Sequence, residues 1–257
     1  MKITILGSGT GIPSLQRCAA GYLLQTETGE HFLIDCGTGI LRQLEQVQVG
    51  FARLDGLFVT HTHSDHIGDL TALVHAFRLP GLPRQKPFYI FGPAGFIDFF
   101  DRIVRPVAEP PSHFPFHILE ARPSWEFQRM TVSTTATVHS DRFNSLAYRF
   151  DRDGKSIVFS GDCDVDARIV HLSHQADLLI CDCSTLAEQK IPGHLCAAEA
   201  GQIASQAQVK HLVPTHFYPI AGPDHLRADE CAQHYSGPIT LAEDFLQLTL
   251  SNDSATG

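Results

Sequence analysis

Three histidines and one aspartate fall within six residues in the segment 60–66, which reads THTHSDH. Imidazole nitrogens and carboxylate oxygens are ligands that suit Zn, Mn and Fe. The segment directly follows 56–60, an apolar run that is typical of a buried strand. A tight turn at a strand end can point several side chains into one space, whereas a solvated loop would have no need of so many imidazoles. The segment therefore predicts part of a metal site, with ligands at His61, His63, Asp65 and His66.

One short segment cannot complete two coordination spheres, so further ligands are expected from other strand ends. His139, Asp162 and His216 have the right setting, because each one closely follows an apolar run that is typical of a strand. Strands of one sheet deliver such residues to a common rim. We therefore expect these three side chains to lie near the 60–66 turn.

The elements that position these residues fall into two halves, each of which mixes strands with helices. This pattern predicts an α/β fold with two sheets and with helices outside, formed by a single domain over 1–250 and followed by a polar tail, 251–257. Segment 105–127 has five prolines and several aromatic residues; as the longest irregular stretch it is interpreted as a lid, a dimer contact or a packed surface loop. Strands are expected at 3–6, 22–26, 31–34, 56–60, 88–91, 130–138, 146–150, 156–160, 178–181, 211–215 and 245–250, and helices at 40–47, 68–77, 93–104, 197–207 and 227–235.

The composition narrows the possible functions. The chain has 257 residues, of which 43% are hydrophobic and 18% charged, with a net charge of −9. An acidic chain is poorly suited to sequence-blind binding of nucleic acid, which needs clustered Lys and Arg. The first apolar run is too short for a signal peptide, and no stretch is long enough for a membrane span. These features favour a cytoplasmic protein without a membrane partner. Seven cysteines, an odd number, argue against a disulfide scaffold, and Cys181 and Cys183 are expected to be buried small hydrophobes.

The motif at 61–66 resembles the HxHxDH signature of the metallo-β-lactamase superfamily. The segments 5–13, 33–37, 90–93 and 242–244 are similar to those of its ribonuclease Z branch. The resemblance covers essentially the whole chain. It implies a four-layer αβ/βα sandwich, in which two mixed β-sheets are flanked by helices and the metals lie at one edge of the paired sheets.

The resemblance also implies roles for the seven ligand candidates. His61, His63 and His139 would hold the first metal ion, Asp65, His66 and His216 the second, and Asp162 would bridge the two. The ions would be zinc by first preference, with manganese or iron as alternatives. The implied nucleophile is a hydroxide that bridges the metals, and Asp65 would also orient it.

Further residues are candidates for supporting roles. Asp35 can fix the tautomer of a ligand imidazole from outside the metal sphere, although a turn-capping role is the alternative. In ribonuclease Z-like enzymes a histidine that matches His194 protonates the leaving oxygen, and its partner carboxylate matches Asp182; the family usually has Glu there, so Asp shortens the reach. The alternatives are a surface histidine at a helix start and a strand-end aspartate. Candidates for substrate contact are Arg142, Asn144 and Tyr218.

A general acid favours a substrate with a poor leaving group, such as a phosphodiester. Ribonuclease Z inserts a long tRNA-binding arm between the ligands that correspond to His139 and Asp162. Only 23 positions separate these residues here, and two strands with their turn fill them. The predicted function is therefore an arm-less phosphodiesterase for a small or cyclic anionic substrate. Dimers are common in the branch that the chain resembles, so a homodimer is one expected oligomeric state. The alternatives are a tRNA 3′-processing endonuclease, a lactone or thioester hydrolase, and a non-catalytic metal-binding protein.

Overall fold

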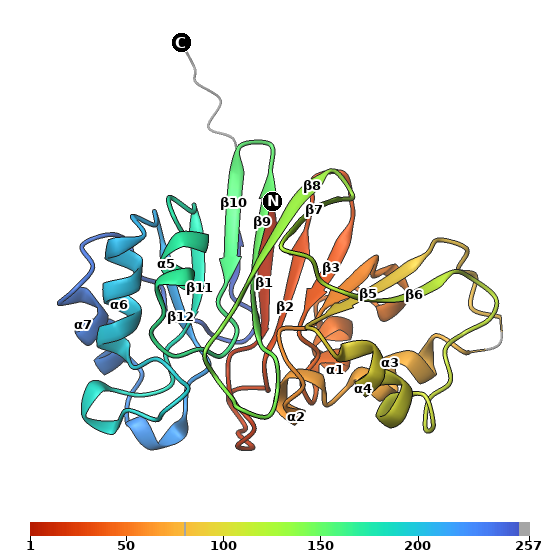
Figure 1. Cartoon of the computed structure of the whole chain (residues 1–257), viewed down its shortest axis with the longest axis horizontal. Helices are drawn as coiled ribbons and strands as arrows, with labels where there is room; N and C mark the ends of the chain where they lie inside the picture. Colours follow the sequence, from red (N-terminus) through yellow and green to blue (C-terminus); the bar gives the residue numbers. More distant parts are fainter. Residues whose placement is uncertain (80, 252–257) are drawn as a thin grey trace, which may run out of the picture.

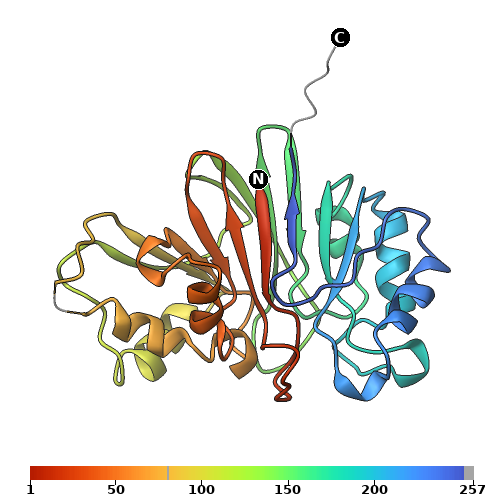
Figure 2. The ribbon, with the colours of Figure 1, turned by 180° about the vertical axis from the view of Figure 1, so that it is seen from behind.

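A computed structural model describes residues 1–79 and 81–251. Two sheets stand face to face in the middle of the molecule, and helices cover the outer side of each one (Figure 1). The view from behind shows the same four layers (Figure 2). The first sheet has the strand order β13-β1-β2-β3-β4-β5-β6 and the second β12-β11-β10-β9-β8-β7. Both sheets mix parallel and antiparallel pairs, which confirms the predicted αβ/βα sandwich.

The bounds of the elements follow the apolar runs closely. The strands of the first sheet are β1 (Lys2–Gly7), β2 (Gly21–Gln25), β3 (His31–Ile34), β4 (Gly56–Phe58), β5 (Phe88–Gly92), β6 (Phe116–Glu120) and β13 (Gln247–Thr249). Those of the second are β7 (Ser124–Phe127), β8 (Met130–Ala136), β9 (Leu146–Arg152), β10 (Lys155–Phe159), β11 (Leu178–Asp182) and β12 (Leu212–Thr215). The helices are α1 (Ile40–Gln46), α2 (Ser64–Ile67), α3 (Leu70–Ala76), α4 (Phe96–Phe99) with a π-helical continuation (Phe100–Val104), α5 (Ala167–Leu172), α6 (Ala197–Gln206) and α7 (His225–Ala232).

Three apolar cores separate the four layers. Alternate residues of the strands point to opposite sides, so Leu33 of β3 packs under α1 and α3 while Phe32 and Ile34 face the second sheet. Phe58 lies at the centre of the inter-sheet core, where its ring packs edge-on against Phe150 with centroids 4.9 Å apart. The third core joins the second sheet to α5, α6 and α7 and contains Cys181 and Cys183, both fully buried as predicted.

The prediction that 105–127 is irregular throughout is wrong. Residues 116–120 form β6, parallel to β5 at one edge of the first sheet, and residues 124–127 form β7, antiparallel to β8 at the edge of the second. Edge strands pair on one side only, so they tolerate nearby prolines and lack a clear apolar alternation. Phe114, in the remaining irregular part, is buried against Phe77. A lid or dimer role for this segment stays a prediction.

Two smaller differences concern helices. Helix α5 was not predicted, because it is only six residues long and its sequence ARIVHL has no clear apolar period. Asp166 caps it by accepting a hydrogen bond from the backbone N–H of Arg168 at 2.8 Å. Helix α7 begins at His225, two residues before its predicted start, and ends at Ala232. Of the predicted tail, residues 252–257 lie outside the described part of the chain. Among the described helices, none combines the length and apolarity that crossing a membrane requires.

Candidate metal centre

The predicted ligands meet at one edge of the two sheets, the lower edge in Figure 1. Strands β10, β11 and β12 run parallel, so their carboxyl ends share this edge and carry Asp162, Asp182 and His216. Strand β8 runs in the same direction and leads to His139. Strand β4 of the facing sheet ends just before the 60–66 turn, which continues into α2. The edge is therefore where the two halves of the chain contribute to one site.

One group of donors consists of His61, His63, His139 and Asp162, whose candidate ligand atoms all lie within 4.8 Å of one another. Nδ1 of His63 is 3.0 Å from Nε2 of His61 and 2.9 Å from Nε2 of His139. Three imidazole nitrogens that converge on one point at this spacing match the requirement of a transition-metal ion for neutral nitrogen ligands.

The second group consists of Asp65, His66 and His216. Oδ2 of Asp65 is 3.8 Å from Nε2 of His66 and 3.4 Å from Nε2 of His216. Asp162 lies between the two groups. Its Oδ1 is 3.3 Å from Nε2 of His66, and its Oδ2 is 3.5 Å from Nε2 of His216 and 3.7 Å from Nε2 of both His61 and His139. Asp162 thus occupies the place that a carboxylate bridging two cations needs.

In four of the five imidazoles, the ring nitrogen that points away from the centre already has a hydrogen-bond partner. Nδ1 of His139 donates to the carbonyl of Gly193 at 2.8 Å, and Nδ1 of His66 donates to Asp35 at 2.7 Å. Nδ1 of His61 lies 3.0 Å from the hydroxyl of Thr60, and Nδ1 of His216 lies 3.2 Å from that of Ser184. Such bonds fix the ring orientation, and they turn the other nitrogen of each ring toward the centre.

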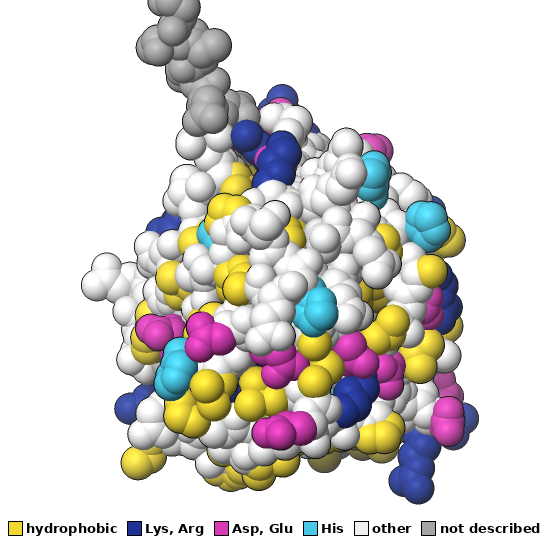
Figure 3. Space-filling model, turned by 90° about the vertical axis from the view of Figure 1, so that its left-hand side faces the viewer, with side chains coloured by type: hydrophobic (Ala, Val, Ile, Leu, Met, Phe, Trp, Pro, Cys, Tyr) yellow, Lys and Arg dark blue, Asp and Glu magenta, His cyan; other side chains and the backbone are white. Residues whose placement is uncertain are grey.

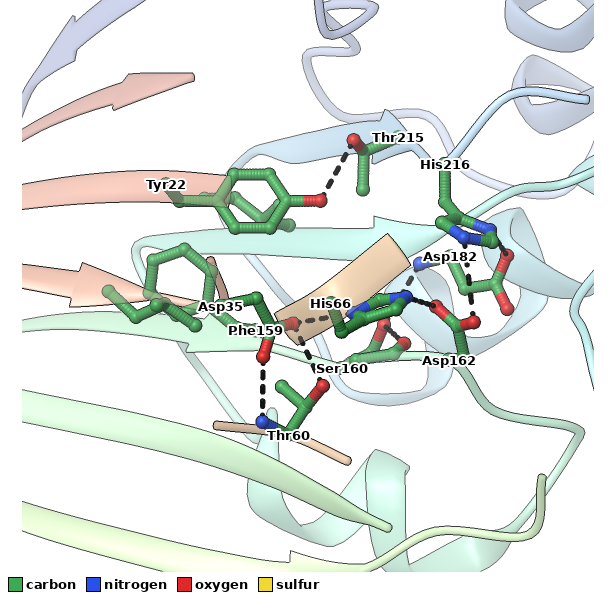
Figure 4. Close-up of a pocket in the computed structure, with 13 residues that line it drawn as sticks. Tyr22, Asp35, Thr60, His66, Phe159, Ser160, Asp162, Asp182, Thr215 and His216 are labelled. Atoms are coloured by element: carbon green, nitrogen blue, oxygen red, sulfur yellow. Dashed lines mark hydrogen bonds and ion pairs between the residues drawn. The ribbon is translucent and has the colours of Figure 1, made fainter. Parts of the chain in front are cut away.

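Asp35 hydrogen-bonds an imidazole of the centre, and its supporting role stays a prediction. Besides His66, its carboxylate accepts hydrogen bonds from the backbone N–H and the hydroxyl of Thr60, at 2.7 and 2.8 Å. The close-up in Figure 4 shows His66 held between Asp35 on one side and Asp162 on the other. Asp35 is 1% exposed, so these bonds compensate for the burial of its charge.

The electrostatics of the centre favour cations. Burial holds the pKa of His61 well below its usual value, and the neighbouring imidazoles, led by His66, lower it further. Burial also lowers the pKa of His66, but Asp162 and Asp35 outweigh it and raise that pKa well above the usual value. Nε2 of His66 is nevertheless buried without a well-oriented hydrogen-bond partner. A metal ion would satisfy that atom, so the residues fit a pair of metal ions.

His194 lies beside the second group. Its Nδ1 is 3.0 Å from Oδ2 of Asp182 and 3.9 Å from Oδ2 of Asp162. Burial lowers the pKa of His194, but the hydrogen bond to Asp182 and its charge raise it to about 9. The preceding Gly193 is required by geometry, since its φ is +85° and a Cβ there would lie 2.5 Å from the carbonyl oxygen of His139. The two predicted residues are therefore paired at the edge of the centre.

The predicted substrate contacts have less uniform positions. Tyr218 lies at the centre, with its ring 5.5 Å from that of His194 and 5.7 Å from that of His216. Asn144 uses its side-chain amide to donate to the carbonyl of Ala94 at 2.9 Å, which fixes the loop after β8. Arg142 is exposed in the same loop. A substrate role for all three stays a prediction.

The structure adds residues that sequence reasoning missed. Thr60 and Ser184 orient His61 and His216, and the only signal for either was its position next to a predicted site residue. Phe143, 37% exposed, packs its ring edge-on against His63 at 5.0 Å. A cleft of about 270 Å³ also opens beside Asp65, between the loop after β1 and residues 38 and 64. The residues that line it include Thr10, Ser14, Arg17, Thr38 and Ser64.

Comparisons with known proteins agree with this architecture. The model of the β-lactamase superfamily domain matches residues 30–217. Ribonuclease Z of Mycobacterium bovis (strain BCG / Pasteur 1173P2) is 28% identical over 276 residues, covering 95% of this chain and 96% of its own. The probable metallo-hydrolase YhfI of Bacillus subtilis is 28% identical over 249 residues, covering 95% of this chain and 97% of its own.

Solved structures show the same likeness. The crystal structure of YhfI has a TM-score of 0.83 at 25% identity and covers 96% of this chain and 98% of its own. That of human short-form tRNase Z has a TM-score of 0.79 at 28% identity and covers 98% of this chain and all of its own. With its buried His/Asp centre, the chain is a metal-dependent hydrolase that belongs to the metallo-β-lactamase superfamily, in the branch that contains ribonuclease Z and YhfI.

Proposed function

We propose that the chain is a phosphodiesterase with two metal ions, which acts on a small or cyclic phosphodiester. The observation that carries the proposal is the hydrogen-bonded pair His194–Asp182 beside Asp162 and His216. A hydrolase of carboxylic esters with good leaving groups has little need of such a proton donor. A phosphodiester releases an alkoxide that must be protonated.

Zinc is the first candidate for both positions, because the centre offers five imidazoles and two carboxylates, a ligand set rich in nitrogen. Manganese and iron accept the same ligands. When bound, such a pair of cations supplies an activated water and neutralises the charge that develops on the phosphoryl oxygens.

The chain's own residues supply the proton transfer. Asp182 holds Nδ1 of His194, so the Nε2–H faces away from Asp182 and is free to protonate a leaving oxygen. Asp182 is itself fixed, because it accepts hydrogen bonds from the hydroxyl of Ser184 at 2.6 Å and the backbone N–H of Cys163 at 3.2 Å. The orientation of His194 is therefore fixed before substrate binds, which lowers the activation free energy of the proton transfer.

The names of the relatives favour a second candidate, tRNA 3′-processing by an endonuclease of the ribonuclease Z type. Two features weigh against it. Strands β9 and β10 are joined by a tight turn at Asp153–Gly154, which leaves no room for an arm between His139 and Asp162. The alignment with the mycobacterial ribonuclease Z spans 276 positions, more than the length of this chain, so that relative has residues that this chain lacks.

Surface charge also weighs against tRNA. Figure 3 shows the face that carries α6 and α7, where Asp and Glu side chains form a band across the lower half among hydrophobic ones. The net charge of the chain is −9. A phosphate backbone would be repelled by such a surface at low salt.

The test is a substrate panel with purified protein loaded with Zn²⁺ or Mn²⁺. We expect hydrolysis of bis(p-nitrophenyl) phosphate and of small cyclic phosphodiesters, and no cleavage of a precursor tRNA at comparable concentration. Asp162→Ala should abolish the hydrolysis, whereas Asp229→Ala, at an exposed position of α7, serves as the control and should not change it. A fully loaded enzyme that is inert to every phosphodiester but hydrolyses lactones or thioesters would overturn the proposal. Efficient cleavage of precursor tRNA would establish the second candidate.

A further inference from the structure

Arg227, on α7, carries a guanidinium group in the interior of the protein, and its side chain is 0% exposed. Its Nη1 donates to Asp224 at 3.0 Å, and its Nη2 donates to the carbonyls of Tyr218 and Ser184 at 2.7 and 3.1 Å. The group also lies over the ring of Phe217, 4.7 Å from its centroid. Burial of a guanidinium is costly, so it persists only where such contacts compensate for the lost hydration.

The two carbonyls belong to segments that carry the site. Ser184 follows β11, and its hydroxyl donates to Asp182 and lies 3.2 Å from Nδ1 of His216. Tyr218 is two residues beyond His216, and its backbone N–H donates to the carbonyl of Ser184 at 3.1 Å. Arg227 therefore links two segments of the site. One carries Asp182, the partner of the proposed acid His194, and the other carries His216, a predicted metal ligand.

Other side chains of the same helix hold the loop that carries His194. Glu230 accepts hydrogen bonds from the backbone N–H groups of Ala187 and Ala198, at 2.9 and 3.1 Å. The thiol of Cys231 donates to the carbonyl of Ala197 at 3.1 Å. Figure 1 shows α7 beside α6 on the outer flank of the second sheet. Helix α7 thus holds the chain near both ends of the segment 184–196, at Ala187 and at the start of α6.

The backbone of the neighbouring ligand needs such a brace. His216 has a φ of +61°, in the left-handed region that a residue with a Cβ rarely adopts. A conformation of this kind persists only where the surroundings hold it in place. The ring of Phe217, the next residue, contacts two guanidinium groups, since Arg17 and Arg227 each lie over it at 4.7 Å from its centroid. Asp224 pairs with both of these arginines.

We propose that Arg227 is a positioning residue, which sets the placement of His194 relative to His216 by clamping the carbonyls of Ser184 and Tyr218. The inference rests on the proposed role of His194 as the proton donor. It predicts that a change at position 227 impairs protonation of the leaving group more than it impairs substrate binding.

The experiment compares methyl p-nitrophenyl phosphate with methyl phenyl phosphate, because p-nitrophenolate leaves without much help whereas phenolate needs the proton. For Arg227→Met we expect kcat to fall about tenfold more for the phenyl than for the p-nitrophenyl substrate, with KM within about twofold of wild type. Arg227→Lys keeps the charge and part of the hydrogen bonding, so its effect should be smaller. Tyr235→Phe is the matched control, since it removes a buried hydrogen bond to the carbonyl of Val209, away from both clamped carbonyls.

A second measurement does not depend on turnover. Hydrogen exchange at the backbone N–H of Tyr218, which is bonded to Ser184, should become faster in both Arg227 variants and stay unchanged in Tyr235→Phe. If Arg227→Met does not fold, Arg227→Lys decides the question by the same two measurements. An equal loss for the two substrates, or unchanged exchange at Tyr218, would overturn the inference. Failure of the proposed function is a different outcome: the wild-type enzyme would hydrolyse carboxylic esters and no phosphodiester. In that case p-nitrophenyl and phenyl esters replace the two phosphates in the same comparison.

Discussion

Nδ1 of His194 lies 3.0 Å from Oδ2 of Asp182, in a position where the imidazole also approaches Asp162 and His216. Burial alone would lower the pKa of His194, and the hydrogen bond to Asp182 reverses that effect. Asp182 therefore favours the imidazolium form of His194, which is the form that the proposed proton donor needs.

The first prediction concerns the leaving group. His194→Ala should lower kcat for methyl phenyl phosphate by about 10²-fold or more and kcat for methyl p-nitrophenyl phosphate by less than about tenfold, because only the first leaving group needs protonation. Steady-state kinetics with both substrates measure this difference. The metal content, determined by atomic emission, should remain at the wild-type level. Equal losses on the two substrates would exclude His194 as the proton donor.

The second prediction concerns pH. In the proposed mechanism His194 acts in its protonated form, so kcat for the phenyl substrate should fall as pH rises through the pKa of His194. Asp182 raises this pKa toward about 9, and bound cations would repel the imidazolium and bring it lower. Asp182→Asn removes the charge that favours the imidazolium, so the alkaline limb should move to lower pH. The pH–rate profiles of the wild type and of Asp182→Asn test the shift. An alkaline limb at the same pH in both proteins would show that another group titrates there.

The sequence predicted which His and Asp side chains gather at this edge because its signals are local. The 60–66 turn is rich in His and Asp, and other single His or Asp residues follow apolar strands. These patterns indicate both the kind of ligand and the sheet edge at which the side chains lie. Asp35 and His194 were predicted from motifs of the same kind. The roles of Thr60, Ser184 and Arg227 could not be predicted in this way. Their contacts are made through space, and Arg227 is 43 residues away from the Ser184 carbonyl that it binds. The strands at 116–120 and 124–127 were missed because edge strands lack the pattern of buried ones.

The third prediction concerns metal affinity. Asp35 accepts hydrogen bonds from Nδ1 of His66 and from the backbone N–H and the hydroxyl of Thr60. Asp35→Asn should therefore loosen the orientation of the His66 imidazole and lower its basicity, while every predicted metal ligand is kept. We expect a loss of about 10- to 100-fold in affinity for the second metal ion. Competition with a chromogenic chelator measures it. Asp177→Asn is the control, because Asp177 also accepts from a backbone N–H at a strand start, that of Ser156, but lies away from the centre. Full affinity in Asp35→Asn would contradict the orienting role.

The last prediction concerns Gly37, the glycine that lies against the 60–66 turn. Gly37 follows Asp35 by two residues, and a Cβ placed there would lie 2.1 Å from the backbone oxygen of Asp65 and 2.8 Å from that of Ala20. Both neighbours are backbone atoms, so no side chain can move aside to make room. Gly37→Ala should therefore push the turn that carries Asp65 and His66 away from β3.

The expected cost of that displacement is about 1–3 kcal/mol of unfolding free energy, the range for an overpacked interior site, together with loss of the second metal ion. Denaturant unfolding and metal analysis measure the two effects. Gly50→Ala is the matched control, since a Cβ there would meet only the carboxylate end of the Glu45 side chain, at 3.2 Å, and that flexible end can shift. Because stability and metal content report on the same displaced turn, they should fall together in Gly37→Ala. If Gly37→Ala lowers the stability but both metal ions stay bound, the prediction is wrong. The position of the turn that carries Asp65 and His66 would then not depend on the close approach of its backbone to Gly37.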